Sequence, residues 1–178
     1  CLFQRGRWQP AYSRQFQINL LSSRTSGHST GITMMEHKTH IKVRYYETDQ
    51  MGVVHHSNYI RYFETAREEM MDHFGVPYTY TESLGIIMPV HAIHCDYIHP
   101  ARYGQVLTVV TTIKEMPRSR ITFHYRVLND SDTLLATGYV TLAFVNASRG
   151  VPVRAPRFLT EVLEKYVNLK KTNQQENV

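Results

Sequence analysis

The segment from Val43 to Tyr59 reads VRYYETDQMGVVHHSNY and changes character twice along its length. It starts as the end of a β-type run, Ile41 to Tyr46, and continues as a loop that holds a carboxylate and a glycine. We expect an amphipathic helix to open after this loop, at Ser57 or Asn58. The first turn of a helix leaves backbone N–H groups unpaired and carries the positive end of the helix dipole. Such an end can hold an oxygen that gains negative charge, while a nearby carboxylate attacks a carbonyl carbon or activates water.

The helix that follows is predicted to run from Tyr59 to Phe74, a length of about 24 Å at 1.5 Å per residue. Gly75 and Pro77 supply its stop, and Tyr78 to Leu84 reads as a loop with a short helical turn. The helix has one apolar face, formed by Tyr59, Tyr62, Phe63, Ala66, Met70 and Phe74.

The remaining regular segments read as strands, with no second long helix among them. Before the helix, His40 to Tyr45 alternates between apolar and polar residues. After it we predict a meander of four antiparallel strands, at Ile86–Ile98, Val106–Met116, Arg120–Leu128 and Leu134–Phe144. This order indicates an α+β fold in which one side of a sheet covers an apolar helix. A further helix is predicted after Pro156, packing on the domain or on a neighbouring chain.

Length and composition fit one globular domain, because 42% of the 178 residues are hydrophobic. No apolar run approaches the roughly 20 residues of a membrane-spanning helix, so we expect a soluble protein. The two cysteines, Cys1 and Cys95, form neither a disulfide framework nor a zinc-finger spacing. We therefore expect a reducing compartment and a cytoplasmic location.

The positive net charge of +5 is concentrated at one end of the chain. Residues 1 to 35 contain four arginines and no acidic residue, and the rest of the chain is close to neutral. A nucleic-acid-binding domain would need a basic stripe on its folded surface, so we expect no nucleic-acid partner.

The acid-free segment, residues 1–35, is interpreted as an N-terminal extension outside the native domain, with the natural start at Met34 or Met35. Its Arg and Ser content also fits a transit peptide, but it lacks the continuous apolar stretch of a secretory signal. We assign residues 36–155 to the main domain and 156–178 to a C-terminal helix and tail.

A longer motif gives a family resemblance. It consists of Tyr46-Glu47-Thr48-Asp49, then Gly52-Val53-Val54, His56, Asn58-Tyr59 and Phe63-Glu64-Thr65-Ala66-Arg67. This pattern resembles the 4-hydroxybenzoyl-CoA thioesterase branch of the hotdog-fold acyl-CoA thioesterases, and within it the bacterial group found beside the Tol-Pal genes. The likeness covers roughly Thr39 to Leu159 and agrees with the strand pattern downstream.

The resemblance implies a hotdog fold, in which a five-stranded antiparallel sheet wraps around one long central helix. It also implies hydrolysis of an acyl-CoA thioester to a free acid and CoA, without a metal or redox cofactor. Homodimers joined sheet to sheet, usually paired into homotetramers, would place the active site between subunits.

In this family the aspartate at the position of Asp49 is catalytic, and the backbone N–H at the position of His56 polarises the thioester carbonyl. From the residues alone, Asp49 could equally cap the helix or form an Asx turn. An ionised Asp49 could act as a nucleophile or as a general base, and both routes stay open. The adjacent imidazoles of His55 and His56 are expected to diverge, which argues against a shared metal ion.

Other residues are expected to contact the substrate. Gly52 would let the backbone approach it closely, and the neighbouring substrate-binding candidates are Val53, Val54 and Tyr59. Three arginines could meet the phosphates of CoA, although solvated surface arginines are an equal alternative: Arg102, Arg118 and Arg120.

For several acidic and histidine residues, a structural role is an alternative to a catalytic or metal-binding one. Glu64 could be a buried acid of the active site, or a partner of Arg67 or Arg61, which we favour. His91 and His94 are three apart on a predicted strand and would face opposite sides, so no metal site is expected there.

Two other functions fit the same residues. A hotdog enoyl-CoA hydratase or dehydratase would use His56 with Glu64 and would not need Asp49. A non-catalytic protein would bind acyl-CoA or acyl carrier protein and leave the thioester intact.

Overall fold

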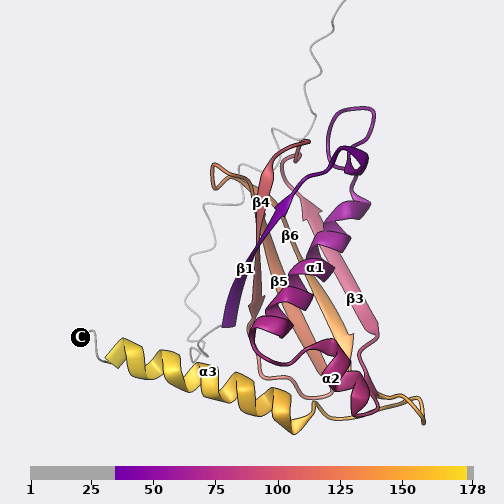
Figure 1. The fold of residues 1–178 in the computed structure, drawn as a ribbon, viewed down its shortest axis with the longest axis vertical. Coiled ribbons are helices and arrows are strands. Elements are labelled where there is room, and N and C mark those ends of the chain that lie inside the picture. The colour runs from indigo at the N-terminus through magenta and orange to yellow at the C-terminus, as the bar shows by residue number, and fades with distance from the viewer. Residues whose placement is uncertain (1–34, 176–178) are drawn as a thin grey trace, which may run out of the picture. The chain divides into compact units, whose positions relative to one another are not determined.

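A five-stranded antiparallel sheet curves around one long helix in the computed structural model, which describes residues 35–175 (Figure 1). The helix, α1, spans Ser57–His73 and begins at one of the two predicted positions. The strands lie in the order β1-β4-β5-β6-β3. Their bounds are β1 Met35–Lys42, β3 Val90–Tyr97, β4 Val106–Ile113, β5 Arg120–Leu128 and β6 Leu134–Ala143. The predicted α+β class is confirmed. The interpretation of residues 1–34 lies outside the described residues.

The predicted four-stranded meander is wrong, because only β4, β5 and β6 are consecutive neighbours. Strand β1 occupies the place beside β4, with Thr39 opposite Val109. Strand β3 therefore pairs at the other side of the sheet with β6, with Ile93 opposite Val140. As a result β3 is an edge strand, although it lies near the middle of the sequence.

Several predicted strand boundaries also need correction. Strand β1 begins at Met35 and not at His40, and β4 ends at Ile113 and not at Met116. Strand β1 ends at Lys42, and Tyr45–Glu47 forms a short 3₁₀ turn, η2, instead of continuing the strand. The Glu47 carboxylate accepts a hydrogen bond from the Arg44 N–H at 2.7 Å, which closes this turn.

The predicted strand Ile86–Ile98 is divided at Pro89, which cannot donate a backbone hydrogen bond. Its first part, β2 (Ile86–Ile87), belongs to a separate three-stranded sheet with β7 (Val145–Asn146) and β8 (Val151–Pro152). The short helical turn predicted before it is present as α2, Tyr78–Ser83.

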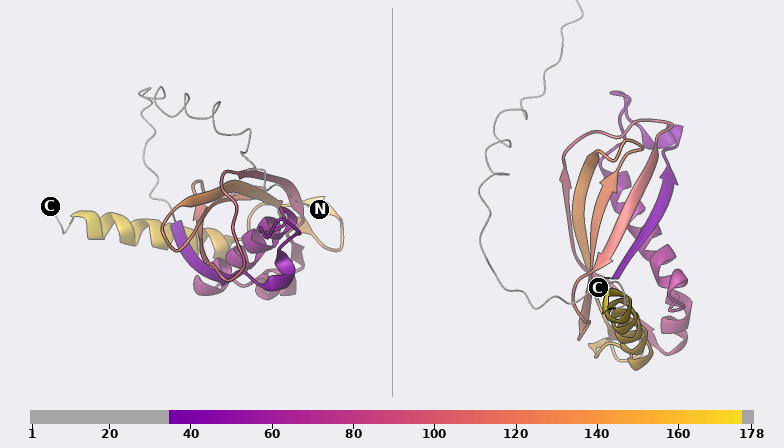
Figure 2. Two further views of the ribbon diagram at one scale, coloured as in Figure 1. Left: turned by 90° about the horizontal axis from the view of Figure 1, so that it is seen from above. Right: turned by 90° about the vertical axis from the view of Figure 1, so that its left-hand side faces the viewer.

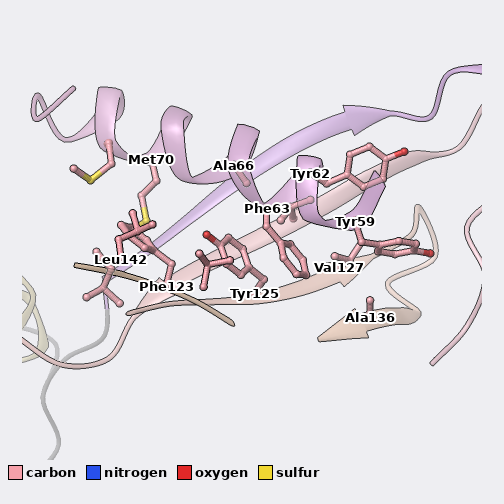
Figure 3. Close-up of a cluster of buried hydrophobic side chains, with 14 of the residues drawn as sticks. Tyr59, Tyr62, Phe63, Ala66, Met70, Phe123, Tyr125, Val127, Ala136 and Leu142 are labelled. Atoms are coloured by element: carbon pink, nitrogen blue, oxygen red, sulfur yellow. The ribbon is translucent and has the colours of Figure 1, made fainter. Parts of the chain in front are cut away.

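The apolar face of α1 fills the concave side of the sheet (Figure 3). Phe63 stacks on Tyr125 with ring centroids 4.3 Å apart and planes 10° from parallel. Gly138 on β6 lies directly beneath this ring: a Cβ there would sit 2.7 Å from the Phe63 ring and 2.4 Å from the His94 carbonyl oxygen. A glycine at this position allows the helix to approach the sheet closely.

One charged side chain, Arg67, is buried between α1 and α2. Its Nε donates a hydrogen bond of 2.5 Å to the Tyr78 hydroxyl, and its guanidinium lies 6.0 Å from the centre of the Phe123 ring. Burial of a cation is tolerated only where hydrogen bonds and ring faces replace water. Arg67 therefore ties α2 to the central helix.

The C-terminal helix α3, Arg157–Gln175, packs on the domain through buried Leu159 and Leu163. Its Phe158 ring contacts Tyr80 at 4.8 Å between centroids. It lies at the end of the sheet opposite the loop that precedes α1, as the two further views in Figure 2 also show. None of the helices within residues 35–175 combines the length and the hydropathy that a membrane-spanning helix requires.

Replacing Gly138 with alanine should destabilise the fold, because the added methyl group collides with Phe63 and with the backbone of β3. We expect the free energy of unfolding to fall by about 1–3 kcal/mol, the usual cost of overpacking a core. Urea denaturation of Gly138→Ala would measure this loss, with Thr137→Ala, on the opposite face of the same strand, as the control. An unchanged unfolding midpoint for Gly138→Ala would contradict the described packing.

Candidate active site

The loop between β1 and α1 folds back on itself as a small hairpin. Thr48 pairs with Val54, and the Asp49 N–H donates to the Val53 carbonyl at 2.9 Å. The Gly52 N–H closes the turn by donating to the Asp49 carbonyl at 2.9 Å. Gly52 has a φ of +70°, a conformation that strongly favours glycine, so the tight loop predicted around it is present.

The Asp49 side chain is half-buried at the base of this hairpin. Its Oδ1 accepts a hydrogen bond from the Met51 N–H at 2.8 Å, which is the Asx-turn pattern named above as the alternative role. Within the described residues, Oδ2 accepts no hydrogen bond. The turn therefore fixes the orientation of the carboxylate and leaves one of its oxygens available.

The start of α1 lies beside this hairpin, because the His55 N–H donates to the Glu47 carbonyl at 2.9 Å. The His56 carbonyl accepts from the Tyr59 N–H at 3.3 Å, as a helix start requires. The described part of the chain offers no acceptor to the His56 N–H itself. A free backbone donor at a helix N-terminus is suited to an oxygen that carries negative charge.

The imidazoles of His55 and His56 do not diverge as predicted: their ring centroids lie 4.0 Å apart. His55 bends back toward the helix start, where its Nδ1 lies 2.8 Å from the Ser57 hydroxyl and accepts from the Ser57 N–H at 3.4 Å. The His55 side chain thus contacts the first residue of α1, a contact that its position before the helix did not reveal. Residues 35–168 contain no group of three or more His, Cys, Asp or Glu side chains that could hold a metal ion.

Tyr97, at the end of β3, is a contact of the helix start that sequence reasoning missed. Its hydroxyl donates to the His56 carbonyl at 3.1 Å, and its ring lies 5.2 Å from that of Tyr59. Partial burial raises the pKa of Tyr97 to about 12, so the hydroxyl keeps its proton at neutral pH. The alternation of β3 could have placed Tyr97 on the helix side, but not next to residue 56.

The predicted substrate-binding residues of the loop divide into exposed and buried groups. Gly52 is exposed and Val53 is half-buried, whereas Val54 and Tyr59 belong to the hydrophobic core. The Tyr59 hydroxyl accepts a hydrogen bond from the Ala101 N–H at 3.2 Å, and burial raises its pKa. Val54 and Tyr59 therefore pack in the core and anchor the loop to it.

The three predicted arginines do not come together within one chain. Arg102 pairs with Val53, and its Nη1 lies 3.9 Å from the point that a Cβ on Gly52 would occupy. Arg118 and Arg120 lie at the start of β5, where Arg120 is opposite Ala143. This is the other end of the sheet, about 26 Å away for an eight-residue strand.

A hollow of about 350 Å³ adjoins Arg120 on the face of the sheet that points away from α1. Burial, followed by the charge of Lys114, lowers the pKa of His124 in this hollow. Beside this imidazole, its walls carry cationic, carboxylate and hydroxyl groups, from Lys114, Glu115, Arg120, Thr122, Tyr139 and Thr141.

Glu64 is exposed, which corrects the expectation of a buried carboxylate on the central helix. One of its oxygens lies 3.8 Å from Nη2 of Arg67, so the favoured structural partnership at i+3 is present. Exposure leaves this ion pair largely screened by water.

Comparisons with known proteins place this geometry in a family. The profile of the Thioesterase-like superfamily matches residues 43–165. The chain is 30% identical to the acyl-CoA thioesterase YbgC of Helicobacter pylori, over 68% of this chain and 96% of that protein. It is 29% identical to the acyl-CoA thioester hydrolase YbgC of Escherichia coli O157:H7, over 66% of this chain and 87% of the relative.

Solved structures agree with the sequence matches. The crystal structure of DHNA-CoA thioesterase from Staphylococcus aureus is 30% identical and superposes with a TM-score of 0.69, covering 80% of this chain and 96% of that one. The 1,4-dihydroxy-2-naphthoyl-CoA thioesterase Slr0204 from Synechocystis, at 20% identity and a TM-score of 0.68, shares the fold. The chain therefore belongs to the Thioesterase-like superfamily and is a thioester hydrolase with the hotdog fold.

Proposed function

We propose that this enzyme hydrolyses an acyl-CoA thioester to a free carboxylic acid and CoA, with Asp49 and the His56 N–H as the reacting site. One observation carries the proposal: a loop carboxylate with a free oxygen is joined by backbone hydrogen bonds to a helix start with a free N–H donor. The names of the relatives and of the solved thioesterases support the same substrate class.

The His56 N–H would donate a hydrogen bond to the thioester carbonyl oxygen and stabilise it as negative charge develops in the transition state. The Asp49 carboxylate would then act in one of two ways. As a nucleophile, it attacks the carbonyl carbon, CoA leaves as the thiolate, and water hydrolyses the mixed anhydride that remains. As a general base, it removes a proton from a water molecule that attacks the same carbon, and the C–S bond then breaks as CoA leaves as the thiolate.

The site would be completed by a second copy of the chain, paired along the edge of β3. This edge carries exposed apolar side chains, including Ile93, which is 45% exposed, and the ring of Tyr97. An unpaired edge with such side chains is a template for another strand. Five exposed large apolar side chains lie on or beside this edge: Val90, Ile93, Tyr97, Ile98 and Tyr139.

Twofold pairing along β3 would also give the distant arginines a role. The Tyr97 end of β3 lies at the Asp49 end of the sheet, and the Val90 end lies near Arg120, since Val90 and Arg120 pair with neighbouring residues of β6. An antiparallel partner strand would bring the opposite end of its own sheet toward Asp49. Arg118 and Arg120 of the second copy could then bind the phosphates of a CoA whose thioester lies at Asp49.

Replacing Asp49 with asparagine should remove the carboxylate while keeping the shape and the Oδ1 acceptor of the Asx turn. We expect kcat for thiol release from acyl-CoAs to fall by about 10²- to 10⁴-fold, the usual contribution of such a group. A thiol-detection assay over several acyl chain lengths would measure it. Asp130→Asn, in the exposed turn between β5 and β6, is the matched control and should keep the wild-type rate.

The same variant separates the proposal from its alternatives. If Asp49→Asn still adds water to an enoyl-CoA while thiol release is absent in both proteins, the enzyme is a hydratase. Acyl-CoA binding without turnover by the wild type would identify a binding protein. Full thioesterase activity in Asp49→Asn would show that the enzyme hydrolyses thioesters without the Asp49 carboxylate.

Introducing a charge at the β3 edge should separate the subunits, because a lysine in the strand interface would be buried without a partner. We expect Ile93→Lys to be monomeric in size-exclusion chromatography with light scattering, and to lose thiol release together with association. Val151→Lys, at the similarly exposed β8, is the control and should stay associated. A fully active monomeric Ile93→Lys protein would show that one chain forms the whole site.

A further inference from the structure

Glu47 accepts four hydrogen bonds from the chain around it. Its backbone carbonyl accepts from the His55 N–H at 2.9 Å and from Nδ2 of Asn58 at 2.8 Å. Its carboxylate accepts from the Arg44 N–H at 2.7 Å and from the Tyr62 hydroxyl at 3.0 Å. We call Glu47, Asn58 and Tyr62 the Glu47 clamp.

The two side-chain donors of the clamp are buried, whereas the turn that they hold is not. Asn58 and Tyr62 are 5% and 2% exposed, in the first two turns of α1. In the turn itself no residue is buried, and Tyr45 and Tyr46 face solvent. The turn therefore has little apolar contact with the core. Its position relative to α1 depends on the hydrogen bonds of Glu47.

The clamp spans the two groups that the proposed reaction requires. Asp49 follows Glu47 by two residues. In sequence, His56 lies between the two residues that donate to the Glu47 carbonyl, His55 through its backbone N–H and Asn58 through its side chain. A shift of Glu47 along α1 would change the separation between the Asp49 carboxylate and the His56 N–H. Misplacement of a reacting group by about 1 Å can cost a factor of about 10² in rate.

We infer that Asn58 and Tyr62 are positioning residues that act through Glu47 to set the separation between the Asp49 carboxylate and the His56 N–H. This role rests on the proposed function. Neither side chain is accessible to substrate, so their effect should fall on the chemical step and leave substrate binding largely unchanged.

The direct test is Asn58→Asp, which keeps the shape of the side chain and replaces the Nδ2 donor with an oxygen facing the Glu47 carbonyl. We expect kcat for thiol release to fall about 10²-fold with KM within about threefold of wild type. Asn129→Asp is the matched control. Within residues 35–168, the Asn129 side chain bonds through its Oδ1 acceptor, toward the N–H groups of Ser131 and Thr133, and an aspartate preserves this acceptor.

A second variant keeps the test decisive if Asn58→Asp does not fold. Tyr62→Phe removes one hydroxyl and leaves the ring in the core, and we expect about a tenfold lower kcat at unchanged KM. In a Glu47→Ala background the hydroxyl has no partner, so Tyr62→Phe should then have no further effect on kcat. A purely structural contribution of Tyr62 would lower the rate equally in both backgrounds.

The outcomes distinguish this inference from the proposed function. If Asp49→Asn abolishes thiol release but Tyr62→Phe, and Asn58→Asp where it folds, keep the wild-type kcat, the positioning role is wrong and the catalytic assignment stands. A raised KM at unchanged kcat, or an equal loss in the Glu47→Ala background, would also overturn it. No thiol release from any acyl-CoA by the wild-type enzyme would remove the proposed function itself.

Discussion

The contact between α1 and the concave face of the sheet is the constraint on which the rest of the structure depends. Phe63 lies flat against Tyr125 and over Gly138, where only a hydrogen atom fits beneath the ring. Once this contact sets the axis of α1, the first turn of the helix must lie beside the end of β3 and the loop from β1. The position of the candidate active site is therefore a consequence of core packing.

The loop before α1 follows a different rule, because polar contacts hold it where the core does not reach. Backbone hydrogen bonds close the Asp49 hairpin, and the Glu47 clamp joins it to α1. In the described residues, Oδ2 of Asp49 and the N–H of His56 are among the groups without a hydrogen-bond partner. Both groups are accessible, because His56 is exposed and Asp49 is half-buried, so a bound ligand can reach them.

Sequence periodicity predicted the elements better than their arrangement. The apolar spacing of α1 and the alternation of β5 each fixed a buried face, so both elements were predicted close to their observed bounds. Alternation cannot say which strands are neighbours, which is why β3 was wrongly placed in a meander. For the same reason, the sequence could not show that Arg118 and Arg120 lie at the other end of the sheet from Asp49. Only the pairing register of β5 shows this. The η2 turn was not predicted, because Val43 and Tyr45 continue the alternating pattern of the strand. The turn forms because the Glu47 carboxylate accepts a hydrogen bond from the Arg44 N–H, which the pattern does not reveal. The pairing of Asp49 with the His56 N–H came from a family resemblance, and as a catalytic arrangement it stays a prediction.

The buried Arg67 has a consequence for how the molecule opens. An arginine keeps its charge at any accessible pH, so releasing Tyr78 would remove the acceptor of its Nε and leave the cation against the Phe123 ring, with the Glu64 carboxylate at 3.8 Å as a weaker partner. Local fraying of α2 is therefore costly despite its six residues. The backbone amides of α2 and of the middle of α1 should exchange with solvent as one cooperative unit, so that this short helix is as long-lived as the core it covers.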